Sequence, residues 1–294
     1  MPFGMTTSGA TMQRAMQDML GKDPQGELWN RSVTAYCDDG CAWTGEEPFC
    51  EGMHHLEELT RVMKKVKASG AQLKMKKCLW CTDEGMLLGH DVRCGDGVSA
   101  DIEKVEAIAA ITELTTAAHL GSFLGSSVYL ARFVKDYASL TAPLYALSAQ
   151  YKYSQTPIGP SSGKWTDEHQ KSFEGIKAAL ISSPVLAFPD WGKAFILLTD
   201  CSDTQLGGMV AQLDSEGRVR PIAFTSRRLS KTERDYGITS KEGLAGVHCF
   251  RKFRNYLLAQ PVIWVTDHSA LTALQSKQDL GSARLVRYGK TNHG

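Results

Sequence analysis

The chain has little excess charge and no long apolar run. Its 33 lysines and arginines face 32 aspartates and glutamates, and the formal net charge of +1 is not by itself evidence for a nucleic-acid partner. No apolar stretch approaches the roughly 18 residues that would span a bilayer. The first residues lack the charged and then apolar segments of a secretory signal. We therefore expect a soluble intracellular protein of about two domains, with no membrane partner.

Cysteine pairs that would staple a small domain are also missing. The eight cysteines are spread over 294 residues, a length that does not need disulfides for stability. Cys78 and Cys81 form a C-x-x-C motif that could hold zinc together with Cys50 or Cys94. A zinc ribbon requires a second such pair, and the sequence has none. Reduced thiols are the preferred interpretation, and a structural zinc site is the alternative.

One stretch rich in proline, glycine and hydroxyl side chains, Ser154–Gly163, interrupts the helical patterning. This composition predicts a domain linker. Before it, apolar residues recur at helical spacing over Met53–Lys67 and Glu103–Leu147, so we expect this part of the chain to be largely helical.

The helical pattern changes near residue 31 to two short extended runs. Arg31–Tyr36 and Cys41–Thr44 flank the sequence Cys37-Asp38-Asp39-Gly40, and the Asp-Gly pair predicts the turn of a β-hairpin. Adjacent carboxylates at a hairpin tip are able to hold the metal ions of nucleotidyl transfer. They are also residues that form turns for purely local reasons. The residues alone leave both interpretations open.

After the linker the pattern predicts strands on either side of a helix. The expected elements are an apolar strand Ala194–Leu198 closing on Thr199-Asp200, a hairpin of Gly207–Leu213 with Arg218–Ser226, an amphipathic helix from about Lys231 to Ala259, and a second apolar strand Val262–Val265 closing on Thr266-Asp267.

Each of the two apolar strands ends on an aspartate. Apolar strands without polar alternation are typical of central strands covered on both faces, and parallel neighbours would bring Asp200 and Asp267 together. The helix between them is a sufficient crossover and carries Glu242 on the same face as Ala245. Three such carboxylates suit Mg²⁺ or Mn²⁺, and two such ions can promote phosphodiester hydrolysis. The alternative is that the aspartates are polar strand ends and Glu242 is a solvated helix residue.

A local basic segment lies between Arg61 and Lys77. It contains seven lysines or arginines and no acidic residue. Such a segment is able to bind phosphate backbones without sequence preference and in a salt-dependent way. The alternative is a solvated helix face.

A series of short motifs follows in order along almost the entire chain. In the first half they are Met1-Pro2-Phe3-Gly4-Met5, Ala10-Thr11-Met12-Gln13-Arg14, Tyr36-Cys37-Asp38-Asp39, Lys77-Cys78, Leu88-Gly89-His90, Ser122-Phe123-Leu124-Gly125 and Pro143-Leu144. In the second half they are Trp165-Thr166, Pro184-Val185-Leu186, Thr199-Asp200-Cys201-Ser202, Ser226-Arg227, Glu242-Gly243-Leu244-Ala245 and Thr266-Asp267-His268. No single motif is decisive, but their order and number closely resemble the polymerase protein (Pol polyprotein) of gypsy-type long-terminal-repeat retrotransposons.

The resemblance implies a chain of mixed α+β and α/β class. Residues 1–98 resemble a partial reverse transcriptase palm that lacks the fingers and the first catalytic aspartate, and residues 99–153 resemble the thumb and connection helices. Residues 154–165 are the expected linker. Residues 166–294 resemble a ribonuclease H (RNase H)-like mixed sheet with helices, incomplete at its carboxyl end.

The resemblance also implies two activities, RNA-directed DNA polymerase (a nucleotidyltransferase) and RNase H (an endonuclease), both dependent on Mg²⁺ or Mn²⁺. Asp38 and Asp39 would belong to the polymerase site, and Asp200, Glu242 and Asp267 would hold the metal for cutting the RNA strand of a hybrid. The expected partners are template-primer nucleic acid, RNA–DNA hybrid and dNTP, in the cytoplasm, a virus-like particle or the nucleus. The candidate nucleic-acid-binding residues are Gln13, Arg14, Lys64, Lys65, Lys74, Lys76 and Lys77.

Two departures from the family pattern lower the activity expected of these residues alone. The family's polymerase site uses a further aspartate on a strand before the Met1–Met5 motif, and its RNase H uses a fourth carboxylate on a helix beyond Arg287-Tyr288, where the resemblance fades. We predict little or no polymerase activity and weak RNase H activity, and primer extension on an RNA template would contradict the first expectation. The alternatives are a degenerate or co-opted remnant that only binds nucleic acid or protein, and a stand-alone RNase H with a helical accessory domain.

Overall fold

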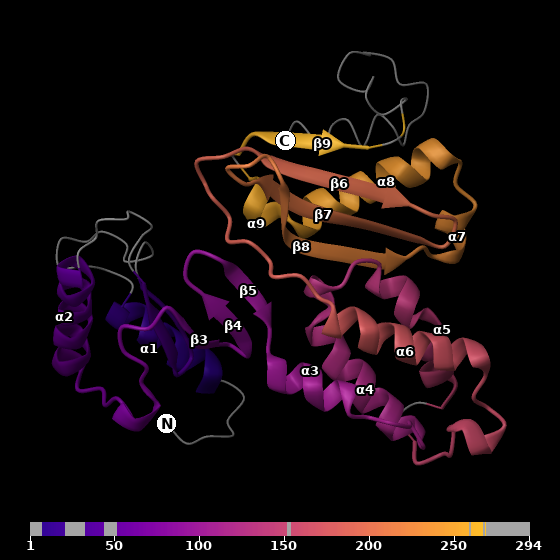
Figure 1. Cartoon of the computed structure of the whole chain (residues 1–294), viewed down its shortest axis with the longest axis horizontal. Helices are drawn as coiled ribbons and strands as arrows, with labels where there is room; N and C mark the ends of the chain where they lie inside the picture. Colours follow the sequence, from indigo (N-terminus) through magenta and orange to yellow (C-terminus); the bar gives the residue numbers. More distant parts are fainter. Residues whose placement is uncertain are drawn as a thin grey trace. The chain divides into compact units, whose positions relative to one another are not determined.

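The computed structural model describes residues 8–20, 33–43, 52–151, 154–258, 260–266 and 268. The chain divides into two compact units, Met1–Gly95 (unit 1) and Asp96–Gly294 (unit 2). Both units mix helices with sheets, as expected from the sequence (Figure 1). Among the described residues, no helix has the length and apolar character needed to cross a membrane.

Unit 1 packs two helices against a short hairpin. Its elements are α1 (Ser8–Leu20), β1 (Val33–Tyr36), β2 (Asp39–Ala42), α2 (Gly52–Ser69), the 3-10 helix η1 (Met75–Lys77), β3 (Glu84–Leu87) and β4 (His90–Arg93). Leu20 of α1, Val33 of β1, and Val62 and Val66 of α2 form one buried apolar cluster. The helix predicted over Met53–Lys67 is confirmed as α2.

The predicted β1–β2 hairpin is confirmed, but its turn lies two residues before the Asp-Gly pair that was expected to form it. The register pairs Tyr36 with Asp39, so Cys37 and Asp38 form the turn and the Asp-Gly pair belongs to β2. Cys37 has a φ of 52°, in the left-handed region that a two-residue hairpin turn requires. The Gln13 side chain of α1 accepts a hydrogen bond from the Cys37 backbone N–H at 2.7 Å, which stabilises the turn at this position.

Unit 2 places a helical layer beside a sheet (Figure 1). Its first elements are β5 (Gly97–Ala100), α3 (Ile102–Ala109), α4 (Ala117–Tyr129), η2 (Ala131–Phe133), α5 (Tyr137–Tyr151), η3 (Pro160–Ser162) and α6 (Asp167–Ile181). Its later elements are β6 (Phe195–Cys201), β7 (Gln205–Leu213), β8 (Val219–Arg228), α7 (Lys231–Arg234), α8 (Ile238–Lys252), α9 (Arg254–Leu257) and β9 (Val262–Val265). The largely helical character predicted for Glu103–Leu147 is confirmed.

The segment expected to be a linker is packed into the helical core. Ile158 is fully buried and joins the cluster that contains Leu120 of α4, Leu144 of α5 and Ile176 of α6. Pro157 forms an isolated β-bridge with Thr116 at the start of α4. An apolar side chain within the polar stretch therefore anchors it to the helices, and its expected role as a domain linker stays a prediction. The domain limits that the sequence suggests on either side stay predictions.

The sheet of unit 2 has four described strands in the order β8-β7-β6-β9. β7 pairs antiparallel with β6 and β8, whereas β9 pairs parallel with β6, with Leu198 opposite Val265. The predicted β7–β8 hairpin and the parallel pair are thus confirmed. Among the described residues β9 lies at the edge of the sheet and Ile263 is 55% exposed, so the cover expected on both faces of β9 is not seen within this part of the chain.

The helix predicted from Lys231 to Ala259 is divided into α7, α8 and α9. The Ser230 and Glu233 side chains form a capping box that begins α7, and Gly237 has extended backbone angles at the N-cap of α8. The buried Phe253 ends α8 and precedes α9. The apolar face that was predicted for the long helix is present on α8. In Figure 1, α8 lies across one face of the sheet.

Candidate active site

Asp38 and Asp39 lie at the exposed tip of the β1–β2 hairpin. Both side chains are exposed to solvent, where carboxylates can reach a metal ion or a nucleotide. Gln13 supports the tip from α1, because its side-chain amide donates a hydrogen bond to the Ala35 carbonyl oxygen at 3.0 Å and accepts one from Cys37. Gln13, expected to contact nucleic acid, therefore holds the hairpin, and a nucleic-acid contact by Gln13 or Arg14 stays a prediction.

The cysteines of unit 1 do not form a metal site among the described residues. Cys78, Cys81 and Cys94 are free thiols, and no described group of three histidine, cysteine or acidic side chains is arranged to hold a metal ion. Cys50, the remaining candidate ligand, lies outside the described residues. Burial, and then the neighbouring Cys94 thiol, raise the pKa of Cys41 on β2.

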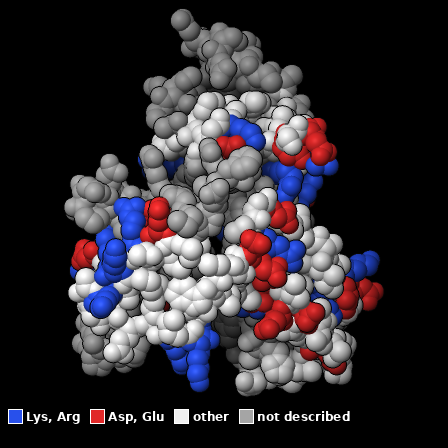
Figure 2. All heavy atoms as spheres, turned by 60° about the vertical axis from the view of Figure 1, so that its left-hand side comes forward, with Lys and Arg blue, Asp and Glu red and all other residues white. Residues whose placement is uncertain are grey.

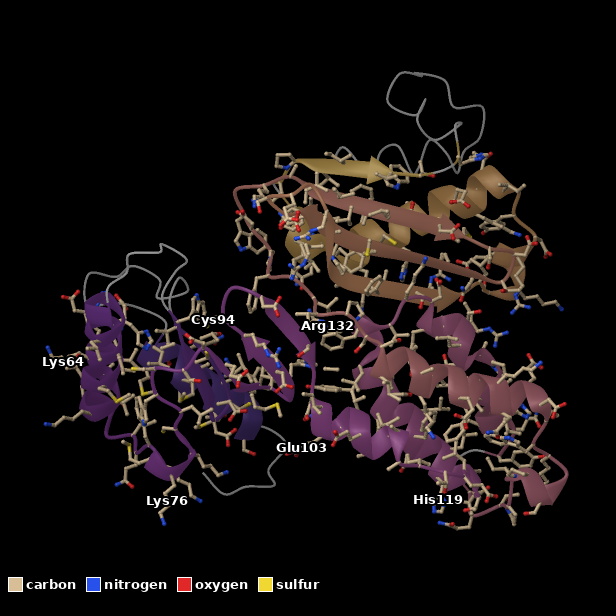
Figure 3. All side chains as sticks on the ribbon, in the orientation of Figure 1. Lys64, Lys76, Cys94, Glu103, His119 and Arg132 are labelled. Carbon is tan, nitrogen blue, oxygen red and sulfur yellow. The ribbon has the colours of Figure 1, made fainter. Side chains whose placement is uncertain are left out.

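The candidate basic residues of unit 1 lie on α2 and η1. Lys64 and Lys65 belong to α2, Lys76 and Lys77 form the end of η1, and Lys74 precedes it. Lys64 and Lys76 extend away from the ribbon in Figure 3. Blue groups of lysine and arginine are visible on the surface in Figure 2. The predicted basic segment is therefore a solvent-facing surface, which either interpretation of it requires.

A second candidate site lies at the carboxyl end of β6. Asp200 is exposed, and Glu242 on α8 is only 5% exposed. The paired part of the two parallel strands reaches Leu198 and Val265, each of which stands two residues before an aspartate in the sequence. Asp267, the second of these aspartates, lies outside the described residues.

The Cys201 thiol, at the end of β6, is influenced by both described carboxylates. Burial raises its pKa to about 12, and the charges of Glu242 and Asp200 contribute in the same direction. The cations of Lys241 and Arg227 act in the opposite direction. The thiol is therefore neutral at neutral pH.

Two glycines allow α8 to approach the sheet closely enough to place Glu242 there. A Cβ at Gly208 of β7 would lie 2.4 Å from the Cys249 sulfur of α8, and a Cβ at Gly246 of α8 would lie 2.4 Å from the Trp264 ring of β9. Trp264 also donates a hydrogen bond from Nε1 to Thr199 Oγ1 at 2.9 Å, which links β9 to β6. Helix and strands thus form one tightly packed frame behind the carboxylates.

Four further side chains join the first turn of α8 to the strand ends, and sequence reasoning did not assign them a role. The Lys241 ammonium donates to Asp203 Oδ1 at 2.8 Å, and a hydrogen bond of 2.7 Å joins Thr239 Oγ1 to His268 Nε2. Lys241 is buried, which is unusual for lysine and not visible in the sequence pattern. The only sequence signal was position, because each residue stands within three positions of a candidate carboxylate.

Comparison with known families agrees with this division of sites. Residues 1–92 match the family described as reverse transcriptase (RNA-dependent DNA polymerase). Residues 165–264 match the family described as RNase H-like domain found in reverse transcriptase. The first match contains the hairpin with Asp38 and Asp39, and the second contains Asp200 and Glu242.

Similar curated proteins are Pol polyproteins of transposons. The chain is 33% identical to the retrovirus-related Pol polyprotein from transposon opus of Drosophila melanogaster, over 98% of this chain and 28% of that protein. It is 31% identical to the corresponding polyprotein from transposon 297, also of Drosophila melanogaster, over 98% of this chain and 25% of that protein. The transposon Tf2-3 polyprotein of Schizosaccharomyces pombe is 26% identical over 98% of this chain and 20% of that protein. The chain thus spans between a fifth and somewhat over a quarter of the length of these relatives.

Solved structures with the same fold come from a foamy viral protease-reverse transcriptase. One, in complex with double-stranded DNA, has a TM-score of 0.79 at 22% identity and covers 100% of this chain and 48% of that chain. Another, in complex with an RNA/DNA hybrid, has a TM-score of 0.74 at 23% identity and covers 99% of this chain and 37% of that chain. These structures agree with the fold. The two family matches and the curated relatives confirm the resemblance seen in the motifs: the chain belongs to the family of reverse transcriptase and RNase H-like segments of retrotransposon Pol polyproteins.

Proposed function

We propose that the chain is the part of a retroelement RNA-directed DNA polymerase and RNase H that carries Asp38 and Asp39 of the polymerase site and Asp200, Glu242 and Asp267 of the nuclease site. The observation that carries the nuclease proposal is the parallel pairing of β6 with β9. Parallel strands end at the same edge of a sheet, and each of these strands leads to an aspartate. Glu242 on α8 lies near enough to Cys201 for its charge to raise the pKa of that thiol.

The side chains at this edge fit hard divalent cations. Asp200 and Glu242 offer carboxylate oxygens, which Mg²⁺ and Mn²⁺ prefer, and the adjacent Cys201 is a neutral thiol with no thiolate to attract softer metals. The ions, when bound, would lower the pKa of a water molecule and stabilise charge on the phosphate oxygens. The protein's own contribution is a rigid carboxylate frame, because Thr199 and Trp264 lock the two strands together behind it.

In the polymerase half, we propose that Asp38 and Asp39 hold divalent metal at the hairpin tip and that template-primer and dNTP bind beside it. The exposure of both carboxylates and the bracing of the turn by Gln13 support this proposal. A hairpin held from α1 keeps its tip in one place, as metal coordination by adjacent residues requires.

The nuclease proposal is tested by cleavage of a labelled RNA strand in an RNA–DNA hybrid, with Mg²⁺ or Mn²⁺ present. The unaltered chain should cleave slowly, and Asp200→Asn and Glu242→Gln should each lower the rate by at least roughly 100-fold, because each removes a charged metal ligand. Asp214→Asn, in the β7–β8 turn, is the matched control and should cleave as the unaltered chain does. Equal rates for all four proteins would show that the cleavage does not come from this site.

A second proposed function, nucleic-acid binding without catalysis, rests on the basic surface of α2 and η1. Solvent-facing lysines on this surface suit the phosphates of a template-primer or hybrid, and the foamy viral relatives were solved with double-stranded DNA and with RNA/DNA hybrid. A chain that binds hybrid but neither cleaves RNA nor extends a primer would favour this function over the enzyme.

A further inference from the structure

The first turn of α8 has no side chain of its own to cap it. Gly237 is the N-cap residue, and it can offer only its backbone carbonyl, which accepts from the N–H groups of Ser240 and Lys241 at 2.9 and 3.0 Å. The first backbone N–H groups of a helix have no partner inside the helix, and a capping side chain usually satisfies one of them. Glu242 directly follows this first turn, so an order imposed on the turn also holds Glu242.

One support comes from the β6–β7 turn, which begins at Ser202, two residues after Asp200. The backbone N–H of Ser202 donates to the Gln205 carbonyl at 2.9 Å, and Ser202 Oγ accepts from the Gln205 N–H at 3.2 Å, so the turn is closed on itself. Asp203 projects from this turn with 94% of its side chain exposed. Its Oδ1 accepts a hydrogen bond from Lys241 Nζ at 2.8 Å. The buried stem of Lys241 thus ends in a bond to the loop that follows Asp200.

The other support comes from the end of β9. His268 follows Asp267 in the sequence, and its ring nitrogen Nε2 shares a 2.7 Å hydrogen bond with Thr239 Oγ1. The His268 backbone N–H donates to Thr266 Oγ1 at 3.2 Å, which holds the residue back against the strand end. Thr239 and Lys241 therefore reach toward the ends of the two different parallel strands from one helical turn.

We infer that Thr239 and Lys241 are positioning residues for Glu242, tying the first turn of α8 to the two aspartate-bearing strand ends through His268 and Asp203. The inference rests on the proposed nuclease function, because only a metal-binding role of Glu242 would make its position matter for activity. An ion pair with an exposed partner contributes little to overall stability, so the Lys241–Asp203 contact is better suited to orienting a helix end than to holding the fold. Side chains that orient metal ligands affect metal affinity strongly although they do not touch the metal.

The test measures Mn²⁺ binding to the whole chain by calorimetric titration. Thr239→Val removes the hydroxyl and keeps the shape, and Lys241→Met removes the ammonium and keeps an unbranched stem. Each should weaken Mn²⁺ binding by about 10-fold or more, the range found for residues that orient metal ligands. Thr239→Ser and Lys241→Arg keep the hydrogen-bonding groups and should restore most of the affinity, a rescue that a merely space-filling role would not produce.

A second measurement, hydrogen exchange of the peptide that covers residues 238–245, does not depend on metal. Exchange in this peptide should be faster in Thr239→Val and Lys241→Met and unchanged in Asp214→Asn, which breaks a comparable ion pair to Arg218 elsewhere. Unchanged exchange in the α4 and α5 peptides would show that the variants remain folded.

The outcomes separate the inference from the function on which it rests. Mn²⁺ binding by the unaltered chain that the two variants retain in full would overturn the positioning role and leave the nuclease proposal standing. If the unaltered chain binds no Mn²⁺, the nuclease proposal fails. The positioning role of Thr239 and Lys241 is then tested by hydrogen exchange alone. Equal exchange in variants and unaltered chain would then overturn them.

Discussion

Gly208 is one of two glycines at which α8 closely approaches the sheet. Besides the Cys249 sulfur, a Cβ there would lie 2.7 Å from the Leu198 backbone oxygen, and a backbone atom cannot be moved aside as a flexible side chain can. Thr199, the partner of Gly208 across the β6–β7 ladder, directly precedes Asp200, so a shift at this point would be transmitted to the candidate site.

Gly208→Ala should therefore lower the free energy of unfolding by about 1–3 kcal/mol, the usual range for an overfilled core. Gly125→Ala is the matched control, because Gly125 lies within α4 with open space around its Cα. That change should raise the free energy of unfolding by about 0.5–1 kcal/mol, since alanine favours helix. Urea denaturation measures both, and a stable Gly208→Ala variant would show that α8 can move away from β7 without loss.

His248, on α8, is a half-buried histidine that is neutral in the folded protein. Burial, followed by the charges of Arg227 and Lys252, lowers its pKa from 6.5 to about 4, and Glu233 opposes the shift. Its Nε2 shares a hydrogen bond of 3.2 Å with Thr225 Oγ1 on β8. Because the unfolded chain binds this proton more readily, stability associated with His248 is fully present above pH 6.5 and is lost as the pH falls toward 4.

We predict that lowering the pH from 7 to 4.5 destabilises the protein through His248 by about 1–2 kcal/mol, after allowance for solvent screening of a half-buried ring. His248→Gln cannot take up the proton and should lose less stability over the same interval, as measured by denaturant unfolding at each pH. His119→Gln, at an exposed position on α4, should keep the pH response of the unaltered protein. An identical response in His248→Gln would remove His248 as the cause.

At the scale of elements, α3 depends on the cap at its first turn. Asp101 is only 5% exposed, and its carboxylate accepts hydrogen bonds from the backbone N–H groups of Glu103 and Lys104 at 3.0 and 3.4 Å. The helix then buries Ile108 in the core that it shares with α6. The cap therefore connects a local backbone requirement to the packing of the helical layer.

Asp101→Ala should lower the free energy of unfolding by about 1–2 kcal/mol, because two backbone donors lose their partner in a buried setting. Asp101→Asn keeps an oxygen acceptor and gives up only the charge toward Lys104, whose Nζ lies 3.3 Å away. It should retain most of the stability in a thermal or urea melt. Equal losses in the two variants would mean that the ion pair, and not the cap, stabilises the start of α3.

An interaction between β8 and α7 also contributes to the division of the predicted long helix into α7, α8 and α9. Arg227 on β8 forms two hydrogen bonds with the Glu233 carboxylate, at 2.8 and 2.9 Å, and these hold α7 against the sheet edge. The Arg227 guanidinium is the largest cause that lowers the pKa of Glu233 to about 2. The spacing of apolar residues gives no information about this ion pair. For that reason the sequence pattern predicted one continuous helix.

At the scale of the whole molecule, a net charge near zero conceals an uneven distribution of charge along the chain. The chain is nearly neutral, yet the segment from Arg61 to Lys77 holds seven basic residues and no acid. Binding of phosphates by such a surface releases counterions, so the affinity for nucleic acid should fall steeply as salt is added.

Changing Lys76 and Lys77 together to glutamine should weaken binding of an RNA–DNA hybrid and reduce the slope of log affinity against log salt by up to about 2, roughly 0.9 for each phosphate that the protein no longer neutralises. Changing Lys171 and Lys193, in unit 2, to glutamine alters the net charge equally and should leave the slope nearly unchanged. Fluorescence anisotropy at several salt concentrations measures the slope. Equal slopes for the two double variants would favour the solvated-face interpretation.

The sequence by itself determined the mixed fold class, most strands and helices, and the family, because apolar periodicity, turn residues and the order of motifs are local properties of the chain. It placed Asp200 and Glu242 on the strand and helix where the structure has them. Only the tertiary structure decided that Ile158 anchors the expected linker, that the hairpin turn lies at Cys37 and Asp38, and that Thr239 and Lys241 reach the strand ends. These features depend on interactions between residues distant in the chain, and such interactions leave no periodic pattern in the sequence.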